Sequence, residues 1–243
     1  MKTSKDAFGE FLLFQYNNPK LQAREIVERD DGFIEATTYS DRYLSEYPSW
    51  SATEKQAMKL VKGKVLDVGC GGGRHALYLQ KKDFDVTGID NSPGAIKVCK
   101  LRGLKKARLI PIEKIGQFKA GSFDTVIMMG NNFSLFANPV KGKVLLRKLF
   151  SVTGSNAQII AETRNPYQTN NKIHLAYHKL NKKRGRMPGQ LRLRVRFRNI
   201  IGPWFEYFFV SPGEMKSLLK GTGWKLKKVI KSKGSDYIAV ITK

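Results

Sequence analysis

The sequence predicts an α/β fold with an open, mostly parallel sheet, and three observations carry this prediction. An apolar strand, 65–68, runs into a glycine-rich turn and then into a helix that begins near residue 74. A second strand, 85–89, ends at Asp90, which lies 21 residues after Gly69. The near-continuous apolar run 123–129 is typical of a strand that is buried on both faces. Strand, turn, helix, strand and terminal acid in this order predict a βαβ nucleoside site.

The spacing of the glycines distinguishes between nucleoside ligands. A dinucleotide fingerprint requires a glycine one helical turn after the second glycine, and position 74 holds an arginine instead. The pattern resembles motif I of the class I S-adenosylmethionine-dependent methyltransferases, and Asp90 resembles their motif II acid. The glycine turn reads Asp67-x-Gly69-x-Gly71-x-Gly73. The resemblance covers about 64–163 and 211–243. It implies a Rossmann-like, mostly parallel seven-stranded sheet with an antiparallel last strand, and S-adenosylmethionine as the cofactor.

The alternation of strands and helices is regular after residue 63, where we expect the cofactor-binding domain, 63–243, to begin. Helices are expected from residue 74, from Pro93, over 141–152 and from Pro212, where Ser211 and Glu214 form a capping box. The expected strands are 64–69, 84–89, 107–112, 123–129, 157–162, 225–230 and 237–241.

Two segments are additions to this core. Residues 1–62 have helical character, and the resemblance implies that they fold over the cofactor site as a lid; a packed N-terminal extension is the alternative. This segment carries the aromatic residues Phe33, Tyr39, Tyr43, Tyr47 and Trp50. Residues 168–210 form an insertion on the substrate side, with a helix over 172–183 and a hairpin made of 191–199 and 204–210.

The charge is strongly basic, with 44 Lys and Arg against 20 Asp and Glu and a net charge of +24. Residues 1–60 hold 10 acids and 8 bases, so the whole excess lies in the rest of the chain. S-adenosylmethionine carries a sulfonium and an ammonium and does not explain this excess. An anionic substrate, RNA or simple solubility each remain open as its cause.

Cysteine and hydropathy patterns favour a cytoplasmic protein without a membrane segment. Two cysteines do not indicate a disulfide framework, and no stretch approaches the ~20 apolar residues that cross a bilayer. The three histidines do not form a metal-binding pattern. Nothing in the sequence indicates the oligomeric state.

Candidate cofactor residues lie at the carboxyl ends of the predicted strands. Gly69 and Gly71 allow the methionine part to approach, and Asp67 orients the turn or reaches the ammonium group. Asp90 and Asn91 are expected at the ribose, and Ile112 and Glu113 at the adenine. Gly73 and Gly130 complete the expected set.

The acceptor side is expected at the segment 130–136 and in the insertion. The segment is similar to the one that follows strand four in small-molecule N-methyltransferases related to the glycine and sarcosine enzymes. His174 and His178 share one helix face and are candidate bases, and solvent-facing or structural roles are the alternative. The alternating strand 191–198 projects its arginines from one face, either toward an anionic acceptor or toward water. The candidate acceptor-binding residues are Asn131, Tyr177, Arg194, Arg196 and Trp204.

The sequence therefore predicts a methyltransferase that modifies a nitrogen or oxygen atom of a small, anionic molecule. An RNA methyltransferase is the first alternative, because 11 basic residues and no acid lie between residues 164 and 198. A non-catalytic protein that binds S-adenosylmethionine or RNA on the same scaffold is the second.

Overall fold

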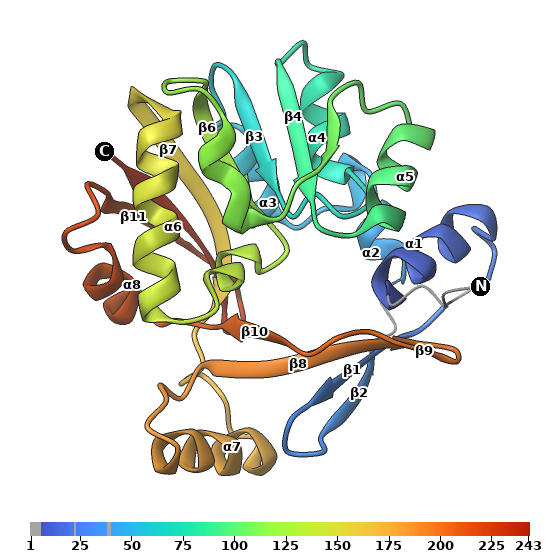
Figure 1. Cartoon of the computed structure of the whole chain (residues 1–243), viewed down its shortest axis with the longest axis vertical. Coiled ribbons are helices and arrows are strands. Elements are labelled where there is room, and N and C mark those ends of the chain that lie inside the picture. Colours follow the sequence, from blue (N-terminus) through green and yellow to red (C-terminus); the bar gives the residue numbers. More distant parts are fainter. Residues whose placement is uncertain (1–5, 22, 38–39) are drawn as a thin grey trace.

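A computed structural model of the chain describes residues 6–21, 23–37 and 40–243 and contains two sheets (Figure 1). In the larger sheet β3, β4, β5, β6 and β7 are parallel, whereas β12 is antiparallel to both β7 and β11. This arrangement confirms the expected fold class. In spatial order its strands are β11 (Lys225–Lys231), β12 (Asp236–Thr242), β7 (Thr153–Arg164), β6 (Phe123–Met128), β3 (Val65–Val68), β4 (Val86–Asp90) and β5 (Ala107–Leu109).

Helices cover both faces of the central sheet. Successive residues of β6 face opposite sides: Val126 and Met128 pack in the cluster that contains Leu149 of α6, whereas Ile127 packs in the cluster that contains Leu77 of α4. The helices of this core are α3 (Ala52–Met58), α4 (Arg74–Gln80), α5 (Pro93–Leu101), α6 (Pro139–Val152) and α8 (Pro212–Leu219), with the 3₁₀ helices η1 (Tyr47–Ser49), η2 (Ile112–Gln117) and η3 (Asn132–Phe136).

The third parallel strand is shorter than expected. Residues 107–112 were predicted as a strand, but β5 ends at Leu109 and η2 begins at Ile112. Pro111 lies between them and has no N–H group for the ladder, which explains the early end of the strand.

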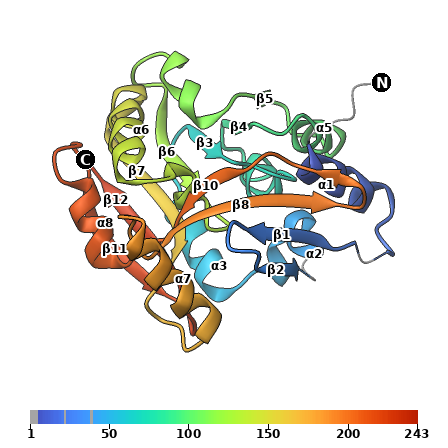
Figure 2. The ribbon, with the colours of Figure 1, turned by 60° about the horizontal axis from the view of Figure 1, so that its bottom comes forward.

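The second sheet joins the N-terminal segment to the insertion. Its antiparallel strands are β10 (Phe205–Phe208), β8 (Gln190–Phe197), β1 (Glu25–Arg29) and β2 (Ile34–Thr37), and β9 (Ile200–Ile201) pairs with β8. The hairpin in the insertion is confirmed, as is its helix, α7 (Lys172–Lys183). Figure 2 shows β8 running past β1, with α7 below it.

The expectation of a helical N-terminal segment is wrong for residues 25–37. Helices α1 (Ala7–Asn17), α2 (Ser40–Leu44) and α3 form there, but β1 and β2 lie between them. Val27 of β1 pairs with Val195 of β8, so the partner that makes this segment a strand comes from a distant part of the chain. Tyr39 lies outside the described residues.

The second sheet lies at the carboxyl ends of the central strands. The Tyr207 hydroxyl on β10 donates a hydrogen bond to the carbonyl oxygen of Asn131, at 2.8 Å, in the loop that follows β6. This contact places the inserted strands next to the edge where an open α/β sheet binds its ligand (Figure 1).

Candidate functional site

The glycine turn between β3 and α4 has the left-handed backbone that its sequence predicts. Gly69, Gly71 and Gly73 have φ angles of 70°, 53° and 77°. A Cβ atom at Gly69 would lie 2.6 Å from Nδ2 of Asn132, whereas one at Gly71 would meet only Cζ of Phe8, at 3.8 Å. The backbone of Gly71 is therefore the part of the turn that a ligand can approach closely.

Asn132 ties the loop after β6 to this turn. Its Nδ2 donates to the carbonyl oxygen of Gly69 at 2.7 Å and to that of Val68 at 3.1 Å. The loops after β3 and β6 thus form one rigid edge, which is a requirement for aligning two reactants.

Asp90 stands at the end of β4, where an acid is expected to bind ribose. Its Oδ2 accepts from the N–H of Gly71 and its Oδ1 from the N–H of Ser92, both at 2.9 Å. A carboxylate has about four lone-pair sites, so two ribose hydroxyls can still donate to it.

Asp67 is a buried acid with an unused acceptor. Its side chain is 2% exposed, and Oδ2 has no hydrogen-bond partner. Burial, followed by the charge of Asp90, raises the pKa of Asp67 to about 7. A buried carboxylate oxygen without a donor fits the ammonium group of S-adenosylmethionine, so the residues at this turn fit the cofactor that the motif implies.

Helix α1 covers the turn. The Asp6 carboxylate accepts from the Ser92 hydroxyl at 2.8 Å and from the N–H of Gly94 at 2.9 Å, at the start of α5. A Cβ atom on Gly94 would lie 2.5 Å from Cα of Gly9, so the two helices touch through glycines. Cζ of Phe8 on α1 would lie 3.8 Å from a Cβ atom at Gly71, and the role of this segment as a lid remains a prediction.

The residues expected at the ribose and the adenine lie at the same edge. Asn91, expected beside the ribose, follows β4 and is exposed, and Ile112, expected at the adenine, is half-buried after β5. The side chain of Glu113 is exposed, and its carbonyl oxygen accepts from Nζ of Lys148 at 2.8 Å. The roles of these residues in cofactor binding remain predictions.

A charged cluster that the sequence analysis did not predict supports the start of α4. The Glu54 carboxylate accepts from Arg74 at 2.6 Å and lies 3.5 Å from Nε2 of His75. The rings of His75 and Trp50 pack 4.6 Å apart. Burial lowers the pKa of His75 to about 4, so this histidine is neutral at pH 7. Arg74, which follows the glycine turn, is a buried ion-pair partner.

Two further features appear at the loop after β6. The N–H of Gly130 donates to Oε2 of Glu162 at 2.6 Å, and Arg42 lies 3.6 Å from the other oxygen of that carboxylate. Asn131 has a φ of 67°, and its Oδ1 is buried without a partner. A non-glycine residue in this conformation is uncommon and is typical of functional loops.

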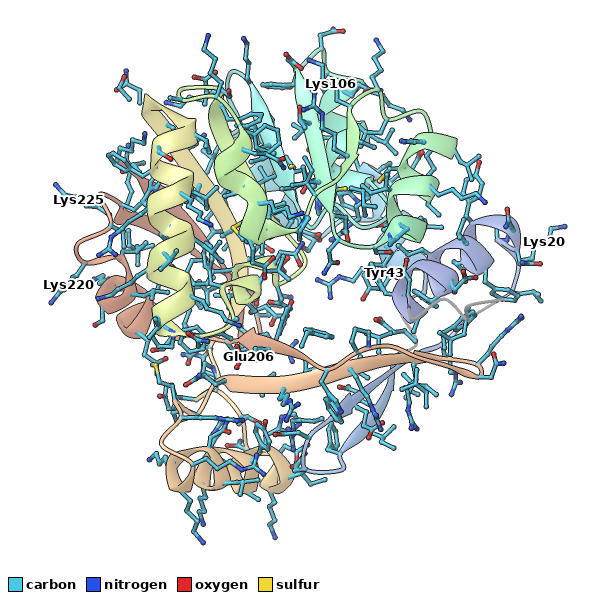
Figure 3. All side chains as sticks on the ribbon, in the orientation of Figure 1. Lys20, Tyr43, Lys106, Glu206, Lys220 and Lys225 are labelled. Carbon is cyan, nitrogen blue, oxygen red and sulfur yellow. The ribbon has the colours of Figure 1, made fainter. Side chains whose placement is uncertain are left out.

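The second sheet contributes side chains that face the loop after β6. Tyr43 donates its hydroxyl proton to Glu25 of β1 at 2.8 Å, and Glu25 is 4% exposed. Tyr43 lies between the central strands and the second sheet (Figure 3). We call Glu25, Arg42, Tyr43, Glu162 and Tyr207 the inter-sheet cluster.

Burial and nearby negative charge raise the pKa of both tyrosines of this cluster. Burial, and then the charge of Glu162, raises the pKa of Tyr207, and burial and Glu25 do the same for Tyr43. Both phenols therefore stay protonated at neutral pH and act as donors.

The arginine strand does not lie where the sequence analysis expected. The guanidinium of Arg194 forms two hydrogen bonds to Glu28, at 2.7 and 2.9 Å, and Nε of Arg196 lies 3.0 Å from the same carboxylate. Tyr207 pairs with Leu191, so the arginines project from the face opposite Tyr207. Trp204 packs against this far face, with its ring 4.5 Å from the guanidinium of Arg194. Arg194, Arg196 and Trp204 therefore pair with one another and with β1, and their contact with an acceptor remains a prediction.

The candidate bases are also away from the glycine turn. They lie on α7, which is below β8 in Figure 1 and packs against the hairpin of β1 and β2. His174 packs 5.6 Å from the ring of Phe33, and His178 lies 6.3 Å from the ring of Tyr167. Tyr177 is buried and donates its hydroxyl proton to Asp30 at 2.6 Å. The structure gives these three residues packing partners and does not bring them to the cofactor edge.

No helix among the described residues is long and apolar enough to cross a membrane. No group of three or more His, Cys, Asp or Glu side chains in the same part of the chain could hold a metal ion.

Residues 65–155 match the model of a family described as a methyltransferase domain. A ubiquinone biosynthesis O-methyltransferase from Bordetella avium is 38% identical over 71 residues, which are 27% of this chain and 30% of that protein. A carboxy-S-adenosyl-L-methionine synthase from Campylobacter hominis is 26% identical over 70% of this chain and 72% of its own length. The chain spans about a third of the length of the first curated relatives that it matches.

Two solved methyltransferase structures resemble this chain to different extents. A methyltransferase from Bacteroides fragilis, in complex with S-adenosyl-L-homocysteine, has a TM-score of 0.83 at 23% identity and covers 100% of this chain and 96% of its own. A 1,6-didemethyltoxoflavin-N1-methyltransferase from Burkholderia thailandensis has a TM-score of 0.53 at 13% identity, over 79% of this chain and 77% of its own. The first of these similarities extends over the second sheet as well as the central one.

Proposed function

We propose that the chain is a class I S-adenosylmethionine-dependent methyltransferase that transfers a methyl group from S-adenosylmethionine to a nitrogen or oxygen atom of a small molecule. The observation that carries the proposal is the pair of buried acids at the glycine turn. Asp67 has an unused carboxylate oxygen, and Asp90 has spare acceptor capacity beside Gly71. These groups match the ammonium and the ribose of the cofactor.

The cofactor supplies a methyl group on a good leaving group, so the protein has to supply alignment and exclusion of water. Asp67 holds the methionine part and Asp90 the ribose, while Asn132 fixes the loop after β6 relative to the turn. Phe8 and α1 shield the turn from solvent. No nucleophilic side chain is needed for a single displacement.

The position of the second sheet supports a small acceptor. Tyr207 and Glu25 lie on strands that pack across the cofactor edge, and Glu25 and Glu162 are buried there. With Arg194 and Arg196 paired to Glu28, the arginine strand no longer favours an anionic acceptor. Lys220 and Lys225, by contrast, point outward at the edge formed by α8 and β11 (Figure 3).

Cofactor binding and transfer can be tested with one pair of variants. Asp90→Asn removes the charge that accepts ribose hydroxyls, and Asp85→Asn, an exposed acid that precedes the same strand, is the control. We expect Asp90→Asn to weaken S-adenosylhomocysteine binding tenfold or more in calorimetry, and Asp85→Asn to bind like the wild type. Transfer of labelled methyl into RNase-sensitive material would mean that the acceptor is RNA and not a small molecule. Equal S-adenosylhomocysteine affinity of Asp90→Asn and Asp85→Asn would contradict the assignment of Asp90 to the cofactor site.

A further inference from the structure

The loop that follows β6 has an unusual backbone. Gly130 and Asn131 are both left-handed, with φ angles of 70° and 67°. A residue other than glycine keeps this conformation only where the surrounding structure holds it there. Oδ1 of Asn131 is also buried and has no hydrogen-bond partner in the part of the chain that the structure describes. The shape of the loop therefore depends on contacts with other elements.

Hydrogen bonds hold the beginning of this loop from three sides. On the side of β7, Oε2 of Glu162 accepts from the N–H of Gly130 at 2.6 Å. On the side of the second sheet, the Tyr207 hydroxyl donates to the carbonyl oxygen of Asn131 at 2.8 Å. On the side of the glycine turn, Nδ2 of Asn132 donates to a carbonyl oxygen of that turn at 2.7 Å. Three successive residues are thus fixed by three separate partners.

The rest of the loop is anchored in the core. Phe133 and Phe136 of η3 are fully buried, and the Ser134 hydroxyl lies 3.5 Å from that of Thr163 on β7. Strand β10 packs against the same short helix. The first residues, 130–132, are therefore the part of the loop whose position is set by the side chains of β7 and β10.

We propose that Tyr207 and Glu162 are positioning residues for methyl transfer, which hold residues 130–132 in a geometry that aligns the acceptor with the methyl group. This proposal rests on the proposed function, which puts the cofactor at the glycine turn and the acceptor beside this loop. Neither side chain has to touch a substrate, because each binds the backbone of the loop. A misplacement of ~1 Å in a reaction of this kind can lower the rate ~100-fold, so these hydrogen bonds can control turnover.

The chain contains a matched tyrosine for comparison. Tyr237 donates its hydroxyl proton to the carbonyl oxygen of Val210 at 2.8 Å, the same distance as for the bond from Tyr207. Tyr237 is buried, and Val210 lies just before α8 and not in the loop after β6. Replacement of either tyrosine by Phe removes one hydroxyl group and one hydrogen bond to a backbone carbonyl. The two variants should therefore lose similar stability, and only one should lose turnover.

The test compares Tyr207→Phe with Tyr237→Phe. Tritiated methyl is transferred from S-adenosylmethionine into the acid-soluble fraction of a cell extract, over a dilution series that gives the limiting rate. We expect this rate to fall at least tenfold in Tyr207→Phe and to stay within twofold in Tyr237→Phe. The affinity for S-adenosylhomocysteine in calorimetry should stay within threefold of the wild type in both, because Asp67 and Asp90 are intact. Urea unfolding should show comparable losses of stability.

A second pair of variants tests the bond from β7. Glu162→Gln keeps an oxygen that can accept from the N–H of Gly130, whereas Glu162→Leu has none. We expect Glu162→Gln to keep at least a third of the limiting rate and Glu162→Leu to lose at least tenfold. Equal losses in both variants would mean that the charge of Glu162 matters and not its bond to the loop, and would overturn its positioning role.

The outcomes separate this proposal from the proposed function. A limiting rate of Tyr207→Phe within twofold of the wild type, or an equal loss in Tyr237→Phe, would overturn the positioning role of Tyr207 and leave the methyltransferase activity standing. A tenfold loss of S-adenosylhomocysteine affinity in Tyr207→Phe would do the same, because this residue would then act on the cofactor site. An absence of enzyme-dependent label in every fraction, together with absent cofactor binding by the wild type, would overturn both proposals.

Discussion

Replacement of Asp67 by Asn should weaken cofactor binding in a way that depends on pH. The wild-type carboxylate is buried, and burial together with the charge of Asp90 raises its pKa to about 7. A hydrogen bond between an ammonium and a carboxylate contributes ~1.5–3 kcal/mol. At about 1.4 kcal/mol per tenfold change, Asp67→Asn should raise the Kd of S-adenosylhomocysteine ~10–150-fold at pH 7.5.

The pH dependence follows from the same pKa. With a pKa near 7, roughly three quarters of Asp67 is ionised at pH 7.5 and roughly a tenth at pH 6.0. The affinity ratio between wild type and variant should therefore shrink roughly eightfold over this range. The amine of the ligand titrates identically in both measurements, so the ratio isolates Asp67. Isothermal titration calorimetry at the two pH values gives both numbers.

The Asp67→Asn substitution should raise the stability of the ligand-free protein at high pH, although it weakens cofactor binding. Because the folded-state pKa of Asp67 is raised above its usual 3.8, its contribution to stability is present below pH 4 and is lost as the pH rises through 7. Asn carries no charge to bury, so the variant should unfold at higher urea concentration than the wild type at pH 8. Equal affinity of the two proteins at pH 7.5, or a ratio that does not change with pH, would refute the assignment of Asp67 to the ammonium group.

Three other variants test separate parts of the structure. Gly94→Ala places a Cβ atom 2.5 Å from Cα of Gly9, so α1 must shift away from the glycine turn. The affinity for S-adenosylhomocysteine should then fall about tenfold. Unchanged affinity in calorimetry would contradict the covering role of α1. The double variant His174→Ala, His178→Ala should keep kcat within twofold, because the two rings pack against Phe33 and Tyr167; loss of turnover in the label-transfer assay would support these residues as bases. Arg194→Met leaves Glu28 on β1 with Arg196 as its arginine partner and should lower the urea midpoint of unfolding at pH 7, whereas an unchanged midpoint would mean that this ion pair is dispensable.

The cofactor edge could be predicted from the sequence because its parts are close together in the chain. Asp67 and Gly71 belong to one turn, and Asp90 is the acid that ends the next strand. The hydrogen bond from Gly71 to Asp90 spans 19 residues, within a single βαβ unit. Local patterns of glycines, apolar runs and a terminal acid were therefore sufficient.

The acceptor side could not be predicted in the same way. Tyr207 and Asn131 are 76 residues apart, and Arg194 and its partner Glu28 are 166 residues apart. Strict alternation predicted correctly that 191–197 lies in a strand with Arg192, Arg194 and Arg196 on one face, whereas Arg198 lies beyond the end of β8. It could not show which face meets the cofactor edge or that β1 supplies a carboxylate to pair with these arginines. The pairing of β8 with β1 and β10 in the second sheet determines both the orientation of the arginines and their carboxylate partner.

The most direct test of the account is the transfer of labelled methyl from S-adenosylmethionine into a cell extract, separated into acid-soluble and acid-precipitable fractions. We predict enzyme-dependent label in the acid-soluble fraction, and its loss with Asp90→Asn. Label confined to precipitate that RNase removes, or no label in either fraction, would contradict the account.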